Sequence, residues 1–226
     1  MSPVMPDFRA RFSRVDTWVF DLDNTLYPHG SDVWPQIDAR ITAFLCQLFG
    51  IDGLSARALQ KYYYETYGTT LKGLMADDNI PSEAFLDFVH DIDRSGLKPD
   101  IPLAAAIGAL PGRKLILTNG SREHALRTAE KLGIHTLFED IFDIVAADLV
   151  PKPEAATFDK FFAKHGVDPA RAAMFEDIDK NLLVPHARGM ATVLVTPAGQ
   201  AAPREAQAHV DFRTDDLAKF LAGVVA

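Results

Sequence analysis

Five short apolar runs alternate with longer amphipathic segments along much of the chain. The runs cover residues 15–20, 114–119, 142–146, 172–175 and 192–195. Continuous apolar runs of this length are typical of strands that are buried on both faces. Apolar residues at helical spacing predict helices over residues 122–132, 153–165, 178–188 and 215–225. Strands that alternate with helices indicate an α/β fold, in which a doubly wound parallel sheet carries helices on both faces.

The segment between the first two runs does not follow this alternation. Its pattern predicts helices over residues 33–49 and 55–67, a short helix from Thr69 or Thr70 to Met75, and another from Pro81. No strand pattern occurs between Leu26 and Gly112. We therefore expect an all-helical domain, residues 27–98, inserted into an α/β core made of residues 1–26 and 99–226.

Composition narrows the functional classes. The chain has 226 residues, 48% of them hydrophobic, and a formal net charge of −8, which argues against non-specific binding to nucleic-acid polymers or anionic membranes. Cys46 is the only cysteine, so the chain has no internal disulfide. No apolar run approaches the ~18 residues of a membrane span, and residues 1–14 do not resemble a secretory signal. The expected location is the cytoplasm, and the sequence carries no sign of an oligomeric state.

Two aspartates end the first apolar run. Asp21 and Asp23 directly follow residues 15–20. Ionised carboxylates are almost never buried without a partner, so both need a reason to be there. They could simply form a turn in which Asp and Asn accept local backbone hydrogen bonds. The other strand ends argue for chemistry instead.

Polar residues follow the other predicted strands in the same way. In an open parallel sheet, ligands bind outside the carboxyl ends of the strands. The residues found there are Thr118, Asn119 and Gly120 after the second run, Lys152 between two prolines after the third, and Glu176 and Asp177 after the fourth. Taken singly, these segments also fit a helix-capping turn, a solvated loop and a surface pair. Together at one edge they predict a site for a phosphate and a divalent cation.

The charges in this set suggest what each residue does. Asp21, Asp23 and Asp177 would repel one another if clustered, and a cation such as Mg²⁺, which prefers oxygen ligands, would relieve the repulsion. The Thr118 hydroxyl and the backbone N–H groups of Asn119 and Gly120 could bind phosphoryl oxygens at a helix N-terminus. Lys152 could neutralise charge on both the nucleophile and the phosphate.

These residues resemble the four signature motifs of the haloacid dehalogenase-like (HAD) hydrolases. The matching stretches are residues 20–26 with Asp21-x-Asp23-x-Thr25, the strand end Leu117-Thr118-Asn119, Lys152 before Pro153-Glu154, and Phe175-Glu176-Asp177 with Asn181. The resemblance implies a Rossmann-like core with a helical cap inserted after the first motif. Residues 23–28, 67–74 and 97–100 also resemble the pyrimidine 5′-nucleotidase subgroup.

The resemblance implies a Mg²⁺-dependent phosphatase acting on a small phosphomonoester. Asp21 would attack phosphorus to form an aspartyl-phosphate, and Asp23 would act as acid and then base. Asp21, Asp177 and the Asp23 backbone carbonyl would hold Mg²⁺. The phosphoryl group would lie against Thr118, Asn119, Gly120 and Lys152, while Glu176 and Asn181 would support the site or serve as alternative ligands.

Three alternative functions stay open at this point. A haloacid dehalogenase would use the same nucleophile but needs neither Asp23 nor a metal, and a phosphomutase shares every core motif. A phospho-acceptor signalling domain also presents acidic residues, a Thr and a Lys, but it would lack the second aspartate and the inserted cap.

The leaving group is harder to predict than the reaction. A nucleoside 5′-monophosphate or a sugar phosphate both fit the motifs. Four cap tyrosines could stack on a base or form a helix core. The turn of residues 68–70 is expected to face the site. Tyr27 and His29 are expected to line its entrance, although His29 also fits an exposed loop histidine. The tyrosines are Tyr62, Tyr63, Tyr64 and Tyr67.

Overall fold

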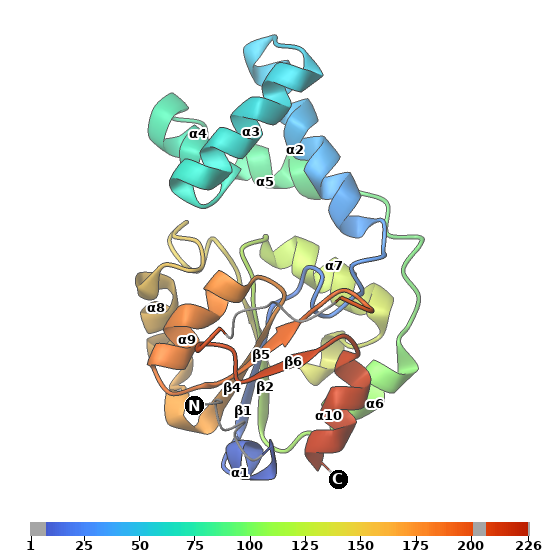
Figure 1. Cartoon of the computed structure of the whole chain (residues 1–226). Helices are drawn as coiled ribbons and strands as arrows, with labels where there is room; N and C mark the ends of the chain where they lie inside the picture. Colours follow the sequence, from blue (N-terminus) through green and yellow to red (C-terminus); the bar gives the residue numbers. More distant parts are fainter. Residues whose placement is uncertain (1–7, 201–206, 226) are drawn as a thin grey trace.

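A parallel β-sheet lies at the centre of the computed structural model, which describes residues 8–200 and 207–225 (Figure 1). Within these residues the sheet has six strands in the order β3-β2-β1-β4-β5-β6. Every neighbouring pair of strands is parallel, which confirms the predicted α/β class. The strands are β1 (Thr17–Phe20), β2 (Arg113–Leu117), β3 (Asp140–Phe142), β4 (Ala172–Glu176), β5 (Ala191–Val195) and β6 (Phe212–Thr214).

The central strand β1 is covered on both faces. Trp18 and Phe20 pack in a cluster with residues of α1 (Phe8–Phe12), α6 (Ile101–Ala109), α7 (Arg122–Leu132) and α10 (Leu217–Val225). Val19 points the other way, into a cluster with α8 (Ala155–His165). Because successive side chains of a strand point to opposite faces, a strand between two helical layers must be apolar throughout. The final helix packs on the sheet as predicted.

Of the five helices between β1 and β2 in the chain, four lie above the carboxyl edge of the sheet (Figure 1). They are α2 (Val33–Phe49), α3 (Gly53–Tyr67), α4 (Thr70–Asp78) and α5 (Ser82–His90), and we call them the cap. They have their own hydrophobic cluster, which includes Leu45, Leu74 and Phe85. The Asp52 and Thr69 side chains accept backbone hydrogen bonds at the starts of α3 and α4, which fixes where these helices begin.

Most predicted elements shift by one or two residues at an end, and two differ more from the structure. The strand predicted over residues 142–146 ends at Phe142, because Asp143 accepts the Ala146 N–H and forms a turn. The helix predicted over residues 178–188 divides into a 3₁₀ turn, Asp179–Leu182, and α9 (Leu183–Ala187). Pro185 has no N–H to donate, so the α-helix begins only two residues before it.

Besides two short 3₁₀ helices, His135–Leu137 and Pro169–Arg171, three elements were not predicted. The helix α6 is apolar on all sides and so shows no helical periodicity. The strand β6 has three residues, of which only Phe212 is buried. The helix α1, near the start of the chain, has only five residues. In the described residues, no helix is both long and apolar enough to cross a membrane.

Candidate active site

The predicted site residues come together at the carboxyl edge of the sheet, beneath the cap. The Asp21 N–H donates to the Phe175 carbonyl at 2.9 Å, so the pairing of β1 with β4 continues one residue past the strand. The Thr118 N–H donates to the Phe142 carbonyl at 3.0 Å and extends β2 in the same way. Glu176 is the last residue of β4. The sheet itself therefore positions these side chains side by side.

Lys152 is buried at the centre of the site. Its Nζ donates to Asp21 Oδ1 at 2.6 Å, to Glu176 Oε1 at 2.6 Å and to the Leu117 carbonyl at 2.8 Å. Burial alone lowers the pKa of Lys152, but the charges of Asp21 and Glu176 outweigh it and raise that pKa above its ordinary value. Lys152 is thus a buried cation that holds two carboxylates, and the interpretation of its segment as a solvated loop is wrong.

Both oxygens of Glu176 are engaged by the protein. Oε1 accepts from Lys152 and from Asn181 Nδ2, the latter at 2.7 Å, and Oε2 accepts the Ile178 N–H at 2.8 Å. Asn181 is itself buried, and its Oδ1 has no hydrogen-bond partner among the described residues. Glu176 and Asn181 therefore hold Lys152 in place.

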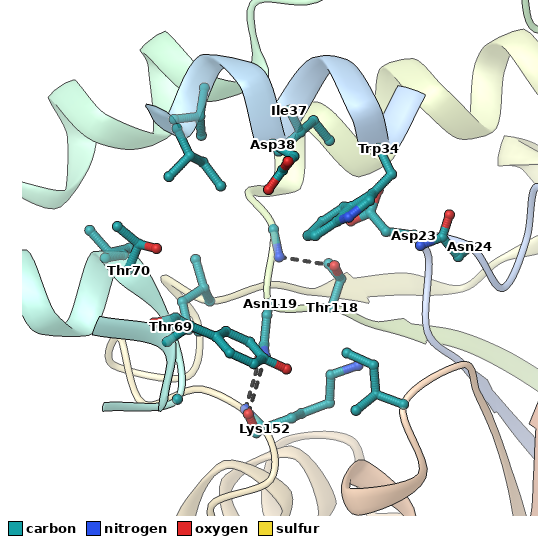
Figure 2. A pocket seen from close by; sticks show the side chains of 18 of the residues that line it. Asp23, Asn24, Trp34, Ile37, Asp38, Thr69, Thr70, Thr118, Asn119 and Lys152 are labelled. Carbon is teal, nitrogen blue, oxygen red and sulfur yellow. Dashed lines mark hydrogen bonds between the residues drawn. The ribbon is translucent and has the colours of Figure 1, made fainter. Parts of the chain in front are cut away.

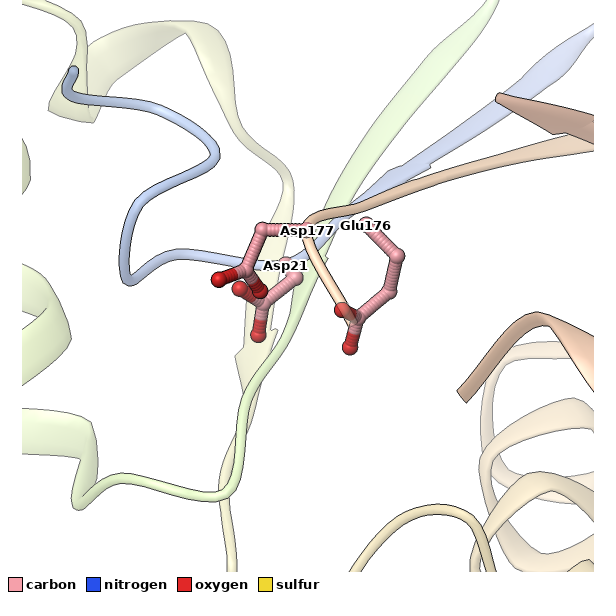
Figure 3. A group of neighbouring side chains, drawn as sticks. All are labelled: Asp21, Glu176 and Asp177. Carbon is pink, nitrogen blue, oxygen red and sulfur yellow. The ribbon is translucent and has the colours of Figure 1, made fainter. Parts of the chain in front are cut away.

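Three carboxylates form a group that fits a metal ion. Oxygen atoms of Asp21, Glu176 and Asp177 all lie within 4.8 Å of one another (Figure 3). Burial, together with neighbouring carboxylates, raises the pKa of Asp21 to about 7 and that of Asp177 to about 9. An all-oxygen set of three carboxylates, with a single lysine against them, suits Mg²⁺. Because Glu176 is already fully hydrogen-bonded, Asp21 and Asp177 are the residues best able to hold the ion.

The loop after β2 is tightly tied to the Lys152 segment. Asn119 Oδ1 accepts the Lys152 N–H at 2.8 Å, and Asn119 Nδ2 donates to the Lys152 carbonyl at 3.2 Å (Figure 2). The buried Thr118 hydroxyl accepts the Gly120 N–H at 3.0 Å. The Asn119 side chain therefore orients Lys152, and the Gly120 N–H is already bonded within the loop. Phosphate binding by these three residues stays a prediction.

Asp23 has two hydrogen-bond donors. Tyr27 donates its hydroxyl to Asp23 Oδ1 at 2.6 Å, and His124 Nε2 lies 2.8 Å from the same oxygen. Burial alone would raise the pKa of Asp23, but the His124 and Tyr27 contacts lower it to about 2. Tyr27 is 2% exposed, so the expectation that it lines the entrance is wrong. His29 lies beside the carboxylates of the site, with its Nε2 3.7 Å from Asp177 Oδ2.

A cavity of about 530 Å³ lies between the cap and these residues. Asp21, Asp23 and Lys152 line its floor, and Trp34, Ile37 and Asp38 reach toward it from α2 (Figure 2). Residues 68–70 belong to its lining, as expected from the sequence. The apolar part of the cap wall includes Ile37, Ile41, Leu71, Phe85, Leu86 and Val89.

The cap tyrosines have different roles. Tyr63 is buried and donates its hydroxyl to Asp78, and Tyr67 donates to Asp77, so both stabilise the contact of α3 with α4. Tyr64 lines the cavity, and Lys180 Nζ lies 4.4 Å from its ring centre. The interpretation of this group as helix core therefore holds for Tyr63 but not for Tyr64.

Sequence reasoning missed two residues beside the site. Trp34 is one turn before Asp38 on α2, and an aromatic residue early in the first cap helix is the only signal for it. His124 is three residues after Ser121, the N-cap of α7, a spacing that returns a side chain to the same end of the helix.

Comparisons with known proteins agree with this geometry. Residues 15–183 match the family described as haloacid dehalogenase-like hydrolase. The chain belongs to this family. The HAD-like chain is 29% identical to Phosphate metabolism protein 8 of Saccharomyces cerevisiae over 192 residues, which is 77% of the chain and 60% of that protein. It therefore spans less than two thirds of this relative's length.

Solved structures share the HAD-like fold at low identity. A HAD phosphatase from Thermococcus onnurineus has a TM-score of 0.62 and 16% identity, covering 93% of this chain and 98% of its own. A HAD hydrolase from Bacillus subtilis bound to magnesium has a TM-score of 0.58 and 14% identity, covering 93% and 99%. An L-2-haloacid dehalogenase from Xanthobacter autotrophicus has a TM-score of 0.56 and 18% identity, covering 93% and 98%. These likenesses establish the fold.

Proposed function

We propose that this HAD-like hydrolase is a Mg²⁺-dependent phosphatase that cleaves small phosphomonoesters, with nucleoside 5′-monophosphates as the substrate class. One observation carries the proposal. Asp21, Asp23 and Asp177 line one cavity, and the buried Lys152 donates a hydrogen bond to Asp21. A nucleophile, an acid and base, and an acidic metal site are the parts that stepwise phosphoester hydrolysis requires.

Asp21 is the nucleophile in the first step. A carboxylate oxygen of Asp21 forms a bond to phosphorus as the bond from phosphorus to the ester oxygen breaks. The leaving alkoxide takes its proton from Asp23, which yields the free alcohol and an aspartyl-phosphate. Because Asp21 Oδ1 is fixed by Lys152, Oδ2 is the oxygen available for attack.

Asp23 acts as the base in the second step. A water molecule attacks phosphorus and gives a proton to Asp23, and the bond between phosphorus and Asp21 breaks to release inorganic phosphate. The hydrogen bonds from His124 and Tyr27 lower the pKa of Asp23, so Asp23 is ionised and can accept that proton. In the first step the negative charge of the bound phosphate raises the Asp23 pKa, which favours the protonated form.

The acidic group supplies the metal site. Asp21 and Asp177 would hold Mg²⁺, together with the Asp23 backbone carbonyl, and the bound ion would neutralise charge on the phosphoryl oxygens. Lys152 contributes a second positive charge beside Asp21. The magnesium-bound relative from Bacillus subtilis supports this choice of ion.

The cavity supports a nucleoside as the leaving group. Its volume of about 530 Å³ lies within the roughly 300–1,000 Å³ of small-ligand sites. Trp34, 41% exposed on the cavity wall, offers a ring on which a base can stack. The name of the yeast relative, Phosphate metabolism protein 8, is also consistent with phosphate chemistry.

A substrate panel tests the proposal. Purified protein is assayed for phosphate release from nucleoside 5′-monophosphates and sugar phosphates, with Mg²⁺ and with EDTA. We expect Mg²⁺-dependent release that is fastest for a nucleoside monophosphate. Asp21→Asn should lower turnover by about 10³-fold or more, because an amide is not a nucleophile, and should leave the fold intact by circular dichroism.

Other results would point elsewhere. Chloride release from 2-chloropropionate without phosphate release would identify a dehalogenase. Transfer of phosphate between sugar positions would identify a phosphomutase, and a stable phosphoprotein without turnover would identify a signalling domain. Faster release from sugar phosphates than from every nucleotide would overturn the substrate class alone.

A further inference from the structure

A hydrogen-bonded chain leads from Asp23 to the segment that joins the cap to the core. His124 Nε2 lies 2.8 Å from Asp23 Oδ1, and His124 Nδ1 lies 2.8 Å from Arg94 NH2. His124 is 1% exposed and Arg94 is 7% exposed, so water does not compete for these contacts. Arg94 lies between α5 and α6, whereas His124 is in the first turn of α7. The chain thus spans three separate segments.

Arg94 decides which nitrogen of His124 carries the proton. A guanidinium group only donates hydrogen bonds, so Nδ1 of His124 must accept. The ring proton is then on Nε2, and this N–H donates to Asp23. A histidine protonated on both nitrogens would place two donors face to face at Arg94. The tautomer therefore follows from the hydrogen-bond partners alone.

The position of Arg94 is itself fixed. Nε donates to the Thr128 hydroxyl at 3.2 Å, NH1 to the Ile92 carbonyl at 3.2 Å, and NH2 to the His90 carbonyl at 3.1 Å. Among the ion pairs between described residues, none includes Arg94. A buried cation without a carboxylate is unfavourable unless another charge compensates it. Among the acidic groups that raise the pKa of Arg94 against the effect of burial, Asp23, on the far side of the imidazole, has the largest effect.

The face of the His124 ring is also covered. His90, the last residue of α5, stacks on it with ring centres 4.4 Å apart and planes 11° apart. His90 Nδ1 lies 3.0 Å from the Ser121 hydroxyl. A Cβ atom at Gly120 would lie 3.2 Å from His124 Cδ2 and 3.6 Å from His90 Nε2, so the glycine makes room for both rings. The imidazole is held on one face and at both nitrogens.

We infer that His124 is a positioning residue for Asp23, and that Arg94 fixes its tautomer. Both donors to Asp23, His124 and Tyr27, bind Oδ1, and in the described part of the chain Oδ2 has no hydrogen bond. His124 thereby turns Oδ2 toward the cavity, where it can exchange protons with the leaving group and with water. This inference rests on the proposed function, because it concerns how Asp23 performs the two proton transfers.

A matched pair of amide substitutions tests the inference. In His124→Gln the amide nitrogen is the same number of bonds from Cα as Nε2, so it still donates to Asp23. In His124→Asn the amide reaches only as far as Nδ1 and keeps the contact with Arg94 instead. The exposed His135→Gln serves as the control for the substitution itself.

We expect kcat for a nucleoside monophosphate to fall roughly 10- to 100-fold in His124→Asn, with KM within about twofold, and to stay within about fivefold of wild type in His124→Gln. With p-nitrophenyl phosphate, whose leaving group departs without a proton, the Asn variant should give a burst of p-nitrophenolate followed by slow turnover. The burst arises because only the second step then needs Asp23.

Several outcomes would overturn the inference. They are wild-type kcat in His124→Asn, equal loss in the Asn and Gln variants, or equal slowing of burst and steady-state phases. A purely structural role would lower the unfolding temperature of both variants and slow every substrate alike. Lack of any turnover by the wild-type protein would instead refute the proposed function, so the two failures are distinguishable.

Discussion

Lys152 shows how one residue can organise a buried polar site. It has three acceptors within 2.8 Å, two of which are carboxylates that receive no other cation in the described residues. Removing one member of a buried ion pair is far more unfavourable than replacing the whole pair, because the remaining charge stays buried and uncompensated. Lys152 therefore matters both for the fold and for the reaction.

Lys152→Met tests this double role. The variant keeps most of the length of the side chain but loses its charge, so we expect the free energy of unfolding at pH 7 to fall by about 3–5 kcal/mol. Turnover should fall by about 10³-fold or more, since both nucleophile and phosphate lose their counter-charge. Urea unfolding and phosphate release measure the two effects.

Lys160→Met is the matched control. Lys160 is exposed and pairs with Asp148 at the surface, so its loss should change the free energy of unfolding by less than about 1 kcal/mol. Equal unfolding midpoints for the two variants would contradict the assigned role of Lys152.

At the residue scale, sequence reasoning could find only side chains that follow an element in the chain. Asp21, Thr118 and Asp177 come directly after apolar strands, and parallel strands end at one edge of a sheet. The contact of His124 with Asp23 joins residues 101 positions apart, and the contact with Arg94 joins residues 30 apart. No local pattern records such a pairing.

At the scale of elements, α3 and α4 approach each other closely at Gly73. A Cβ atom there would overlap the ring of Tyr63, whose hydroxyl is bonded to Asp78 on α4. A ring held at both ends cannot move aside without losing its hydrogen bond or its place in the cap core. The glycine is therefore required by packing, since its backbone is ordinary helix.

Gly73→Ala should be destabilising for this reason. Although alanine favours a helix, overpacking of a filled core is unfavourable by about 1–3 kcal/mol, and we expect a loss of that size in the free energy of unfolding. Gly53→Ala is the control, because no atom lies within 4 Å of a Cβ at that position. Thermal unfolding that is unchanged by Gly73→Ala would show that the cap is more loosely packed than described.

Elements were predictable where their burial leaves a pattern. Strands between two helical layers are apolar throughout, and α2 to α5, with one face on the cap core, keep helical spacing. The helix α6 packs beside α10 in the cluster on one face of the sheet, and its residues are apolar throughout, so they show no period. The turn at Asp143 depends on a side-chain hydrogen bond, which apolar periodicity does not report.

At the scale of the whole molecule, folding concentrates negative charge at one edge of the sheet. The pKa of Asp177 is raised to about 9, above the ordinary value near 3.9 that it has in the unfolded chain. A raised pKa means that the ionised carboxylate is less favourable in the folded state, so it opposes folding at pH 7. A bound cation would reverse this effect.

Mg²⁺ should therefore stabilise the protein. Ligand at about 100 times its Kd adds about 2.7 kcal/mol, which corresponds to a rise in Tm of roughly 5–10 °C for a protein of this size. Asp177→Asn should lose most of that rise, while its Tm without Mg²⁺ should equal or exceed that of wild type. Thermal unfolding with Mg²⁺ and with EDTA measures both.

The exposed Asp87→Asn provides the comparison. Asp87 lies on the cap helix α5 and belongs to no acidic group, so this variant should keep the full response to Mg²⁺. The same response in Asp177→Asn would place the ion elsewhere.

The joint between cap and core, from His90 to Arg94, also bears on how this enzyme could be altered. Arg94 lies outside the cavity lining, yet it determines which nitrogen of His124 donates to Asp23. In a random-mutagenesis screen, substitutions of Arg94 should lower kcat and leave KM unchanged, although Arg94 does not line the substrate cavity. Directed evolution could therefore adjust the turnover rate through this joint. Substrate choice could be adjusted separately through Trp34, which lines the cavity.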